Sequence, residues 1–243
     1  MKAFGITDIG QVRSVNQDTY AILPLSDEAG LSIVCDGMGG PGGGQIASEM
    51  AVRSITQDIK AHYHSPMEAD EIKKMIADAV KRANAEVFKK STTAEELAGM
   101  GTTMVLAIYG NGRAIVANIG DSRAYVVNGG SIAQVTKDHS IVQQMLDSGQ
   151  ISKFEARSHP KKNIITRALG VDLVCQADFF EVSLQKNDFL ILCSDVLSNY
   201  VDENELAFEL SVCDDPADAL KKFVAMANAR GGSDNITAVT VAG

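Results

Sequence analysis

The segment TMVLAIYGNGRAIVANI, residues 103–119, decides the fold class. Two apolar runs, Thr103–Tyr109 and Arg113–Ile119, are separated by the turn sequence GNG at 110–112. Glycine and asparagine accept positive φ angles, so this turn lets two neighbouring strands pair in antiparallel orientation. The segment therefore predicts a β-hairpin with largely apolar strands.

Comparable apolar runs on both sides of the hairpin indicate a chain rich in β-strands. They are Leu31–Cys35, Ser122–Val127, Asp188–Cys193 and Ile236–Val241. Two long amphipathic patterns, at 45–62 and 68–90, predict helices with one apolar face that can cover a sheet. A later helix is expected between Asp215-Pro216 and the glycine pair at 231–232. The predicted fold class is α+β, with antiparallel sheets covered by helices in one domain.

The composition limits the classes of function to consider. With 243 residues, of which 45% are hydrophobic and 22% charged, the chain can bury one substantial core. A net charge of -9 disfavours nucleic acid and anionic membranes as partners. The apolar runs are far shorter than the roughly 20 residues of a membrane-spanning helix, and the N-terminus lacks a signal-peptide pattern. The widely spaced cysteines favour free thiols in a reducing compartment, so we expect a cytoplasmic protein.

Aspartates near the ends of apolar runs are the candidate functional residues. Asp36, Asp121 and Asp195 each follow such a run closely, and Asp234 precedes the final run. Carboxylates that meet at strand ends of one core can bind hard cations, which prefer oxygen ligands. Two cations about 3.5–4 Å apart can activate a bridging water and offset the charge of a phosphoryl group. An aspartate beside glycine is also common in a simple turn, so spacing alone predicts a metal site without naming its substrate.

A series of motifs across nearly the whole chain resembles the type 2C family of metal-dependent serine/threonine protein phosphatases, in its compact bacterial form. The motifs are GITDIG (5–10), RSVNQD (13–18), CDGMGG (35–40), GTT (101–103), NIGDSR (118–123), TKDHS (136–140), HP (159–160), TRALG (166–170), SD (194–195) and GSDN (232–235). The resemblance implies a four-layer α/β/β/α sandwich, with two central antiparallel sheets flanked by helices, as a single phosphatase domain over 1–243. The polar, basic segment at 141–167 corresponds to the family's variable flap. Its basic residues could help receive phosphorylated or acidic segments, or could belong to a solvated loop.

The resemblance also implies the metal ligands, which are Asp36, Gly37, Asp121, Asp195 and Asp234. Asp36 would bridge two Mn²⁺ or Mg²⁺ ions, and the Gly37 carbonyl would bind the first of them. Asp195 and Asp234 would hold the second ion. Asp121 would bind a weaker third ion together with Asp195. Both metals suit carboxylate and water ligands.

Arg13 and Asp18 are the expected catalytic residues. Arg13 matches the family arginine that grips the phosphate, and a guanidinium fork fits two phosphoryl oxygens. The alternative is that Arg13 simply pairs with a nearby aspartate. Asp18 corresponds to the outer-shell carboxylate that orients water on the first metal. Arg123 is interpreted as part of a structural ion pair, and the Asp138-His139 motif is likewise interpreted as structural.

Two departures from the family pattern bear on catalysis. Pro41 stands where bacterial relatives usually carry a histidine that can donate a proton, and Met38 stands where other relatives place theirs. General acid catalysis contributes ~10²–10⁴-fold, so its loss could be severe. Val196 replaces a usual glycine beside Asp195, and a β-branched residue there could shift that carboxylate if the position needs a positive φ.

The leading hypothesis is a phosphatase that hydrolyses phosphoserine and phosphothreonine in proteins by attack of a metal-bridging water. Its partners would be phosphorylated proteins, the substrates of a Ser/Thr kinase, and we expect a monomer that binds neither nucleic acid nor membranes. The rival hypothesis is a catalytically weak or inactive module that keeps the fold and recognises a phosphorylated partner. A phosphatase of small phosphomonoesters is a third hypothesis, disfavoured because the sequence offers no dedicated small-molecule pocket.

Overall fold

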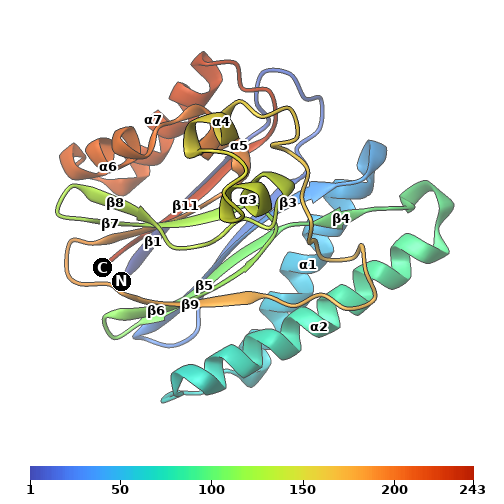
Figure 1. Cartoon of the computed structure of the whole chain (residues 1–243). Helices are drawn as coiled ribbons and strands as arrows, with labels where there is room; N and C mark the ends of the chain where they lie inside the picture. Colours follow the sequence, from blue (N-terminus) through green and yellow to red (C-terminus); the bar gives the residue numbers. More distant parts are fainter.

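Two antiparallel sheets form the centre of the molecule, and helices cover the outer face of each (Figure 1). The computed structural model describes residues 1–243, apart from the side chain of Pro41. Each sheet packs one face against the other sheet and its second face beneath helices, so the central strands are buried on both faces. The predicted four-layer sandwich is confirmed.

One sheet joins strands from distant parts of the chain. Its order is β1 (Lys2–Asp8), β11 (Ile236–Ala242), β10 (Phe189–Cys193), β7 (Arg123–Asn128) and β8 (Ser131–Gln134). The other sheet contains β2 (Asp18–Pro24), β3 (Ala29–Met38), β5 (Met104–Gly110), β6 (Arg113–Ile119) and β9 (Asp178–Ser183), with the short β4 (Gly101–Thr102) beside β3. Side chains such as Val34, Leu192 and Val239 are fully buried between the two sheets.

Two long helices cover the outer face of the sheet that contains β3. They are α1 (Gly40–His62) and α2 (Ala69–Thr93), and they bury Ile55, Ile59 and Ile76 completely. The other sheet is covered by α5 (Asp195–Tyr200), α6 (Glu203–Val212) and α7 (Pro216–Ala229), which enclose Phe223 in a second apolar cluster. None of the described helices is both long and apolar enough to cross a membrane.

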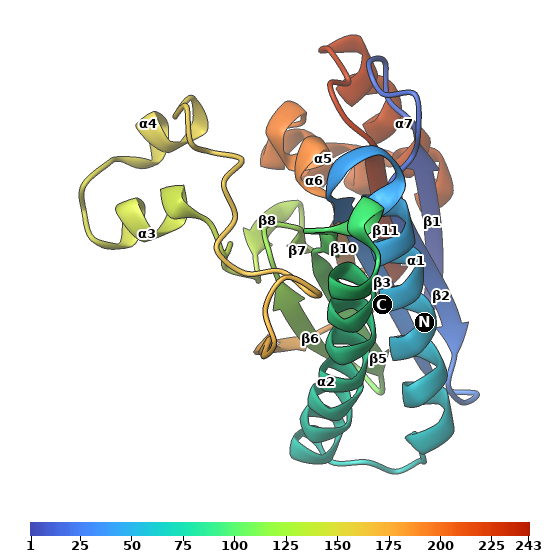
Figure 2. The same ribbon diagram turned by 90° about the vertical axis from the view of Figure 1, so that its right-hand side faces the viewer.

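The flap, residues 141–167, leaves the sandwich and projects to one side (Figure 2). It contains two short helices, α3 (Ile141–Asp147) and α4 (Lys153–Arg157), each with a serine at its N-cap. The two ends of the flap are held together by backbone hydrogen bonds. The Ile141 N–H donates to the Ile164 carbonyl at 3.0 Å, and the Thr166 N–H donates to the His139 carbonyl at 2.7 Å.

Most of the predicted elements are present. The hairpin at 103–119 has the predicted antiparallel form, with Asn111 and Gly112 at positive φ angles of 50° and 74°. The three predicted helices correspond to α1, α2 and α7, although α1 begins at Gly40, before the predicted start near residue 45. Strands β1, β2, β8 and β9 and the short β4 were not predicted. Strands β1, β2, β8 and β9 lie at sheet edges and are mostly not fully buried, so their sequences show no long apolar run.

Candidate functional site

Asp36 lies inside β3, which continues past the apolar run Leu31–Cys35. The strand extends to Met38 because Gly37 and Met38 pair with β4. The Thr103 amide and the Thr102 hydroxyl both donate to the Asp36 carbonyl at 2.9 Å, and the Asp36 amide donates to the Thr103 hydroxyl at 3.0 Å. In the register of the sheet, Asp36 stands opposite Asp18. Strand pairing therefore fixes these two carboxylates beside each other.

Gly37 has room for its backbone only. Its N–H donates to the Gln17 carbonyl at 3.2 Å, and a Cβ at this position would lie 2.0 Å from the Gly44 carbonyl oxygen. This close approach between β3 and the start of α1 excludes any residue with a side chain. The glycines of the CDGMGG motif thus serve packing as well as backbone freedom.

Asp195 and Asp234 come from the other sheet. Asp195 is the first residue of α5, directly after β10, and the Asn199 side-chain amide donates to its carboxylate at 3.2 Å. Asp234 precedes β11, the strand that pairs with β10. The pairing of these two strands brings the two aspartates to the same end of their sheet.

Val196 does not occupy the backbone conformation that would require glycine. It lies in the first turn of α5, its side chain is buried, and it belongs to the same apolar cluster as Phe223. Among the residues that the structure describes, positive φ angles outside glycine occur at Asn111 and Asn187. The condition for the predicted displacement of Asp195 is therefore not met.

Asn235 fastens the loop that carries Arg13 to the start of β11. Its side-chain oxygen accepts from the Gln17 N–H at 2.8 Å, and its side-chain amide donates to the carbonyls of Ile9 and Val15 at 2.9 and 3.1 Å. These three bonds hold both ends of the loop 9–17. Asn235 belongs to the GSDN motif, but its role was not predicted. Its bonding partners are more than 200 residues away in the sequence, so the sequence carries no local signal of this role.

Asp121 follows a turn that is closely packed against the strand segment beside Asp36. Gly120 has a φ of 97°, and a Cβ there would meet the Thr103 Cγ2 at 2.7 Å. The Ser122 hydroxyl is hydrogen-bonded to the Thr103 hydroxyl at 2.7 Å. Thr103 therefore contacts the residues on both sides of Asp121 as well as the backbone of Asp36.

Burial and mutual repulsion raise the pKa values of these carboxylates. Burial raises the pKa of Asp18 to about 7 and that of Asp121 to about 8, and the charge of Asp195 adds to both shifts. Burial, followed by the charges of Asp18, Asp195, Asp121 and Asp234, holds the pKa of Asp36 well above its ordinary range. A group of carboxylates that repel one another in this way would be stabilised by a bound cation.

The donor set fits hard divalent cations. The Asp18 Oδ2 atom is buried without a hydrogen-bond partner among the described residues, so it can accept a bond from a water on a cation. Within the described part of the chain, no three acidic, histidine or cysteine side chains form a complete ligand group by themselves. Such a group is not required, because Mg²⁺ keeps several waters and takes one or two carboxylates.

Arg13 and Arg123 each pair with an aspartate, in different surroundings. The Arg13 Nη2 atom lies 2.5 Å from the Asp234 Oδ2 atom, with side chains 50% and 40% exposed. Arg123 binds both oxygens of Asp138 and donates to the Tyr125 hydroxyl at 3.1 Å. The ion pair predicted for Arg123 is present. The exposed pair of Arg13 costs little to break, so its guanidinium can change partners.

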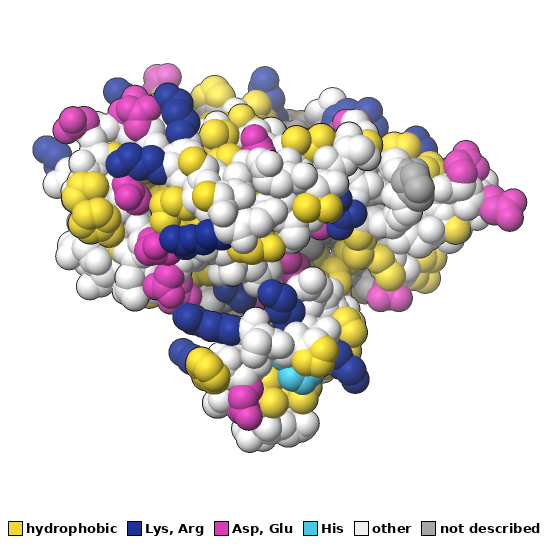
Figure 3. All heavy atoms as spheres, turned by 90° about the horizontal axis from the view of Figure 1, so that it is seen from above, with side chains coloured by type: hydrophobic (Ala, Val, Ile, Leu, Met, Phe, Trp, Pro, Cys, Tyr) yellow, Lys and Arg dark blue, Asp and Glu magenta, His cyan; other side chains and the backbone are white. Residues whose placement is uncertain are grey.

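A cavity of about 670 Å³ lies between the flap and the body of the molecule. Asp121 and Asp195 line it from the body, and Lys153 and Lys162 line it from the flap. Figure 3 shows Lys and Arg side chains gathered along this hollow. Burial raises the pKa of Asp195 and the charge of Asp234 adds to the shift, whereas the charges of Arg123 and Lys162 oppose it.

Known proteins resemble this chain over nearly its whole length. The family model described as protein phosphatase 2C matches residues 10–224. The serine/threonine phosphatase stp of Listeria monocytogenes serotype 4b is 40% identical over 235 residues, which cover 97% of this chain and 93% of that protein. Protein phosphatase PhpP of Streptococcus pneumoniae serotype 2 is 39% identical over 239 residues, covering 97% and 95%. The crystal structure of the serine/threonine phosphatase Stp1 from Staphylococcus aureus has a TM-score of 0.93 at 34% identity, covering 99% and 94%.

Proposed function

This chain belongs to the protein phosphatase 2C family, and we propose that it hydrolyses phosphoserine and phosphothreonine in proteins at the aspartate cluster. It is a serine/threonine protein phosphatase of the bacterial type. One observation supports this location of the site: Asp18 and Asp36 stand opposite each other across β2 and β3, and Asp121 and Asp195 line one cavity. Among the described residues only Asp234 of this cluster forms an ion pair, so pairing with Arg or Lys does not explain the arrangement.

The proposed metal ligands are Asp36, the Gly37 carbonyl, Asp195 and Asp234, with Asp121 at a weaker third site. When bound, Mn²⁺ or Mg²⁺ would supply an activated water and positive charge beside the phosphoryl oxygens. Asp36 is suited to a shared position because strand pairing fixes its backbone between Asp18 and the segment at 102–103. Support for the third site comes from the cavity that Asp121 and Asp195 line together.

Arg13 and Asp18 would act directly on the reacting groups. The Arg13 guanidinium would leave Asp234 and donate two hydrogen bonds to the phosphoryl oxygens. The unpartnered Asp18 oxygen would accept a hydrogen bond from the attacking water and so fix its orientation. The water attacks phosphorus directly, so no covalent enzyme intermediate forms.

The proton for the leaving oxygen has no donor at the usual position. Met38 carries no acidic proton, and Pro41, whose side chain lies outside the described part of the structure, carries none either. Water or another residue has to protonate the leaving alkoxide. The missing proton donor is the observation that supports the second candidate function, a weakly active or inactive module that binds phosphorylated partners.

The flap would receive the protein segment that flanks the phosphorylated residue. Lys153 and Lys162 line the cavity, and neither forms an ion pair among the described residues. By contrast, Arg157 is 3.6 Å from Asp202 on the opposite wall. Two unpaired ammonium groups beside the metal site favour segments with acidic residues near the phosphate.

The remaining proposals concern the whole protein. We propose that residues 1–243 act as one phosphatase domain, as a monomer, on proteins phosphorylated by a Ser/Thr kinase. Its four cysteines are all free thiols, which suits the reducing cytoplasm. Phosphorylated proteins are the proposed partners, without nucleic acid or membrane.

The test is phosphate release from a phosphothreonine peptide at varied Mn²⁺ concentration. Wild type should release phosphate with saturable dependence on Mn²⁺, and Asp36→Asn should abolish the release. Asp27→Asn is the matched control, because Asp27 is exposed at the opposite end of the β2–β3 hairpin. Equal release from wild type and Asp36→Asn would refute the proposed site. Tight peptide binding without release by wild type, with release restored in Pro41→His, would establish the binding-module function instead.

A further inference from the structure

His139 lies where the turn before Asp121, the flap and β9 meet. It follows β8, precedes the flap and is only 9% exposed. The Asp138-His139 motif was expected to be structural, without a role for the imidazole ring. Each of its four polar groups has a hydrogen-bond partner in the structure.

The first half of this network holds the turn before Asp121. The Gly120 N–H donates to the His139 Nδ1 atom at 3.0 Å, and the His139 N–H donates to the Gly120 carbonyl at 2.9 Å. His139 therefore binds both backbone groups of Gly120. Because Nδ1 accepts from an N–H, it carries no proton, and the proton of the neutral ring is on Nε2.

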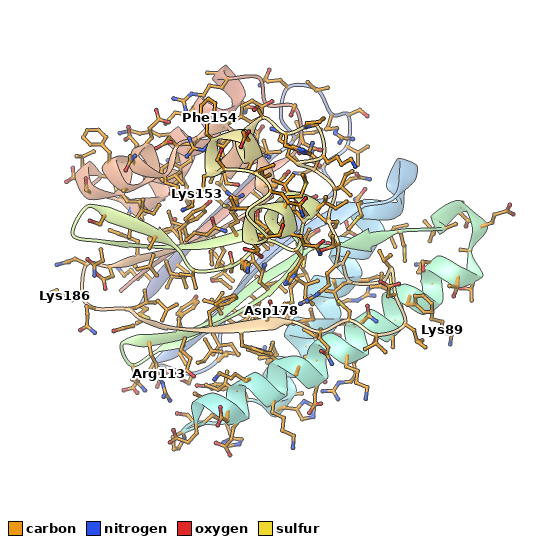
Figure 4. The ribbon with its side chains drawn as sticks, viewed as in Figure 1. Lys89, Arg113, Lys153, Phe154, Asp178 and Lys186 are labelled. Atoms are coloured by element: carbon orange, nitrogen blue, oxygen red, sulfur yellow. The ribbon has the colours of Figure 1, made fainter. Side chains whose placement is uncertain are left out.

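The second half of the network holds the flap. The His139 Nε2 atom lies 3.1 Å from the Asp178 Oδ2 atom, and Arg167 donates to the Asp178 Oδ1 atom at 2.7 Å. The His139 carbonyl accepts from the Thr166 N–H at 2.7 Å. Figure 4 shows Asp178 at the start of β9, beneath the flap. Both ends of the flap thus converge on the residue that holds Gly120.

We propose that His139 is a positioning residue that couples the flap to cation binding at Asp121. The inference rests on the third metal site proposed above. Movement of the flap acts on the His139 carbonyl and, through Arg167 and Asp178, on its ring. The ring passes this displacement to Gly120, whose packing against Thr103 leaves little room for independent adjustment. Cation affinity at Asp121 is therefore highest when the flap keeps its hydrogen bonds to His139 and Asp178.

Two substitutions of similar size separate the two halves of the network. In His139→Asn the side-chain oxygen can take the place of Nδ1 and accept from Gly120, while the contact with Asp178 is lost. In His139→Gln the side-chain amide can reach Asp178, while the Gly120 N–H loses its acceptor. The readouts are Mn²⁺ binding measured by calorimetry without substrate and hydrogen exchange of the Ile141 and Thr166 amides. Thermal unfolding confirms that both variants are folded at the temperature used.

We expect His139→Gln to weaken the lowest-affinity Mn²⁺ site by about 10–100-fold, as outer-shell changes commonly do, and to leave the tighter sites unchanged. His139→Asn should keep that affinity within about 3-fold while its flap amides exchange faster. Unchanged Mn²⁺ binding in His139→Gln, or equal weakening in both variants, would overturn the proposal. The Asp121→Asn variant tests the third metal site independently of the role of His139. If it removes no Mn²⁺ site, the third-site assignment fails, whatever His139 does.

Discussion

The aspartate cluster and the flap are neighbours around one cavity, yet the chain holds them in different ways. Backbone pairing, a glycine without space for a Cβ and the buried Asn235 fix the cluster. The flap is tied at its two ends and by two exposed ion pairs, Arg157–Asp202 and Lys137–Asp147. The Phe154 side chain on α4 is 84% exposed. Under the proposed function, the reacting atoms would therefore be placed by the more tightly held region, and the choice of substrate would be left to the region with fewer ties.

The largest expected difference between the aspartate cluster and the flap is the loss of stability caused by a glycine-to-alanine substitution. Gly37→Ala would force a Cβ to within 2.0 Å of the Gly44 carbonyl oxygen, so β3 or α1 must shift. We expect a loss of stability at or beyond the upper end of the ~0.5–3 kcal/mol typical of single substitutions, with loss of Mn²⁺ binding. Gly149→Ala in the flap is the control. Its φ is 69° and no atom lies within 4 Å, so ~1–2 kcal/mol is expected. Equal thermal unfolding midpoints for both variants would contradict the contrast.

Arg13→Lys tests the exposed side of the cluster. A lysine keeps the charge but loses the two-pronged fit to phosphoryl oxygens, so kcat/KM should fall by about 10–100-fold. Arg53→Lys on α1, where the arginine is also exposed, should leave steady-state kinetics unchanged. If Arg13→Lys matches wild type, the pairing with Asp234 is the only role of this arginine.

Removal of metal should give the cluster an unusual dependence of stability on pH. The ordinary aspartate pKa is 3.8, and the folded values are about 7 for Asp18 and about 8 for Asp121. Between these limits the folded state binds more protons than the unfolded state, so the free energy of unfolding falls as pH rises. We expect the metal-free protein to melt a few degrees higher at about pH 6 than at about pH 8.5. Asp18→Asn should reduce this difference, and saturating Mn²⁺ should remove it, because cations favour the charged carboxylates. An increase in melting temperature over the same range would count against the raised pKa values.

The smallest expected effect belongs to the flap. Exposed charge pairs contribute about 0.2–1 kcal/mol each, so Lys153→Glu with Lys162→Glu should lower kcat/KM for an acidic phosphopeptide by about 2–30-fold. A neutral phosphopeptide should be affected less, and added salt should reduce the difference between the two peptides. Lys186→Glu, in the exposed turn between β9 and β10, is the control. An equal loss with both peptides would place the two lysines in the reaction itself.

The sequence predicts the centre of the fold better than its edges. The hairpin at 103–119 and helices α1, α2 and α7 carry long apolar patterns because both strands, or one helical face, are buried. Strands β1, β2 and β9 need less apolar surface at sheet edges, so their patterns are weak.

The aspartates of the site could be identified from their positions beside apolar runs. The residues that surround and bond to them could not be predicted. The apolar run before Asp36 ends at Cys35, whereas pairing with β4 extends the strand past Asp36 to Met38. Asn235 and His139 act through hydrogen bonds to residues far away in the chain, which no local pattern records. The metal ligands themselves remain predictions from motif and geometry.

The placement of β11 between β1 and β10 has a consequence for synthesis on the ribosome. Asp234 and β11 follow every other site residue along the chain, so a growing polypeptide exposes β1 and β10 with no strand between them. Translation at about 5–20 residues per second leaves these edges unpaired until β11 emerges. Chaperone demand should therefore persist until β11 has been synthesised, and nascent chains that stop short of Asp234 should be inactive and prone to aggregation.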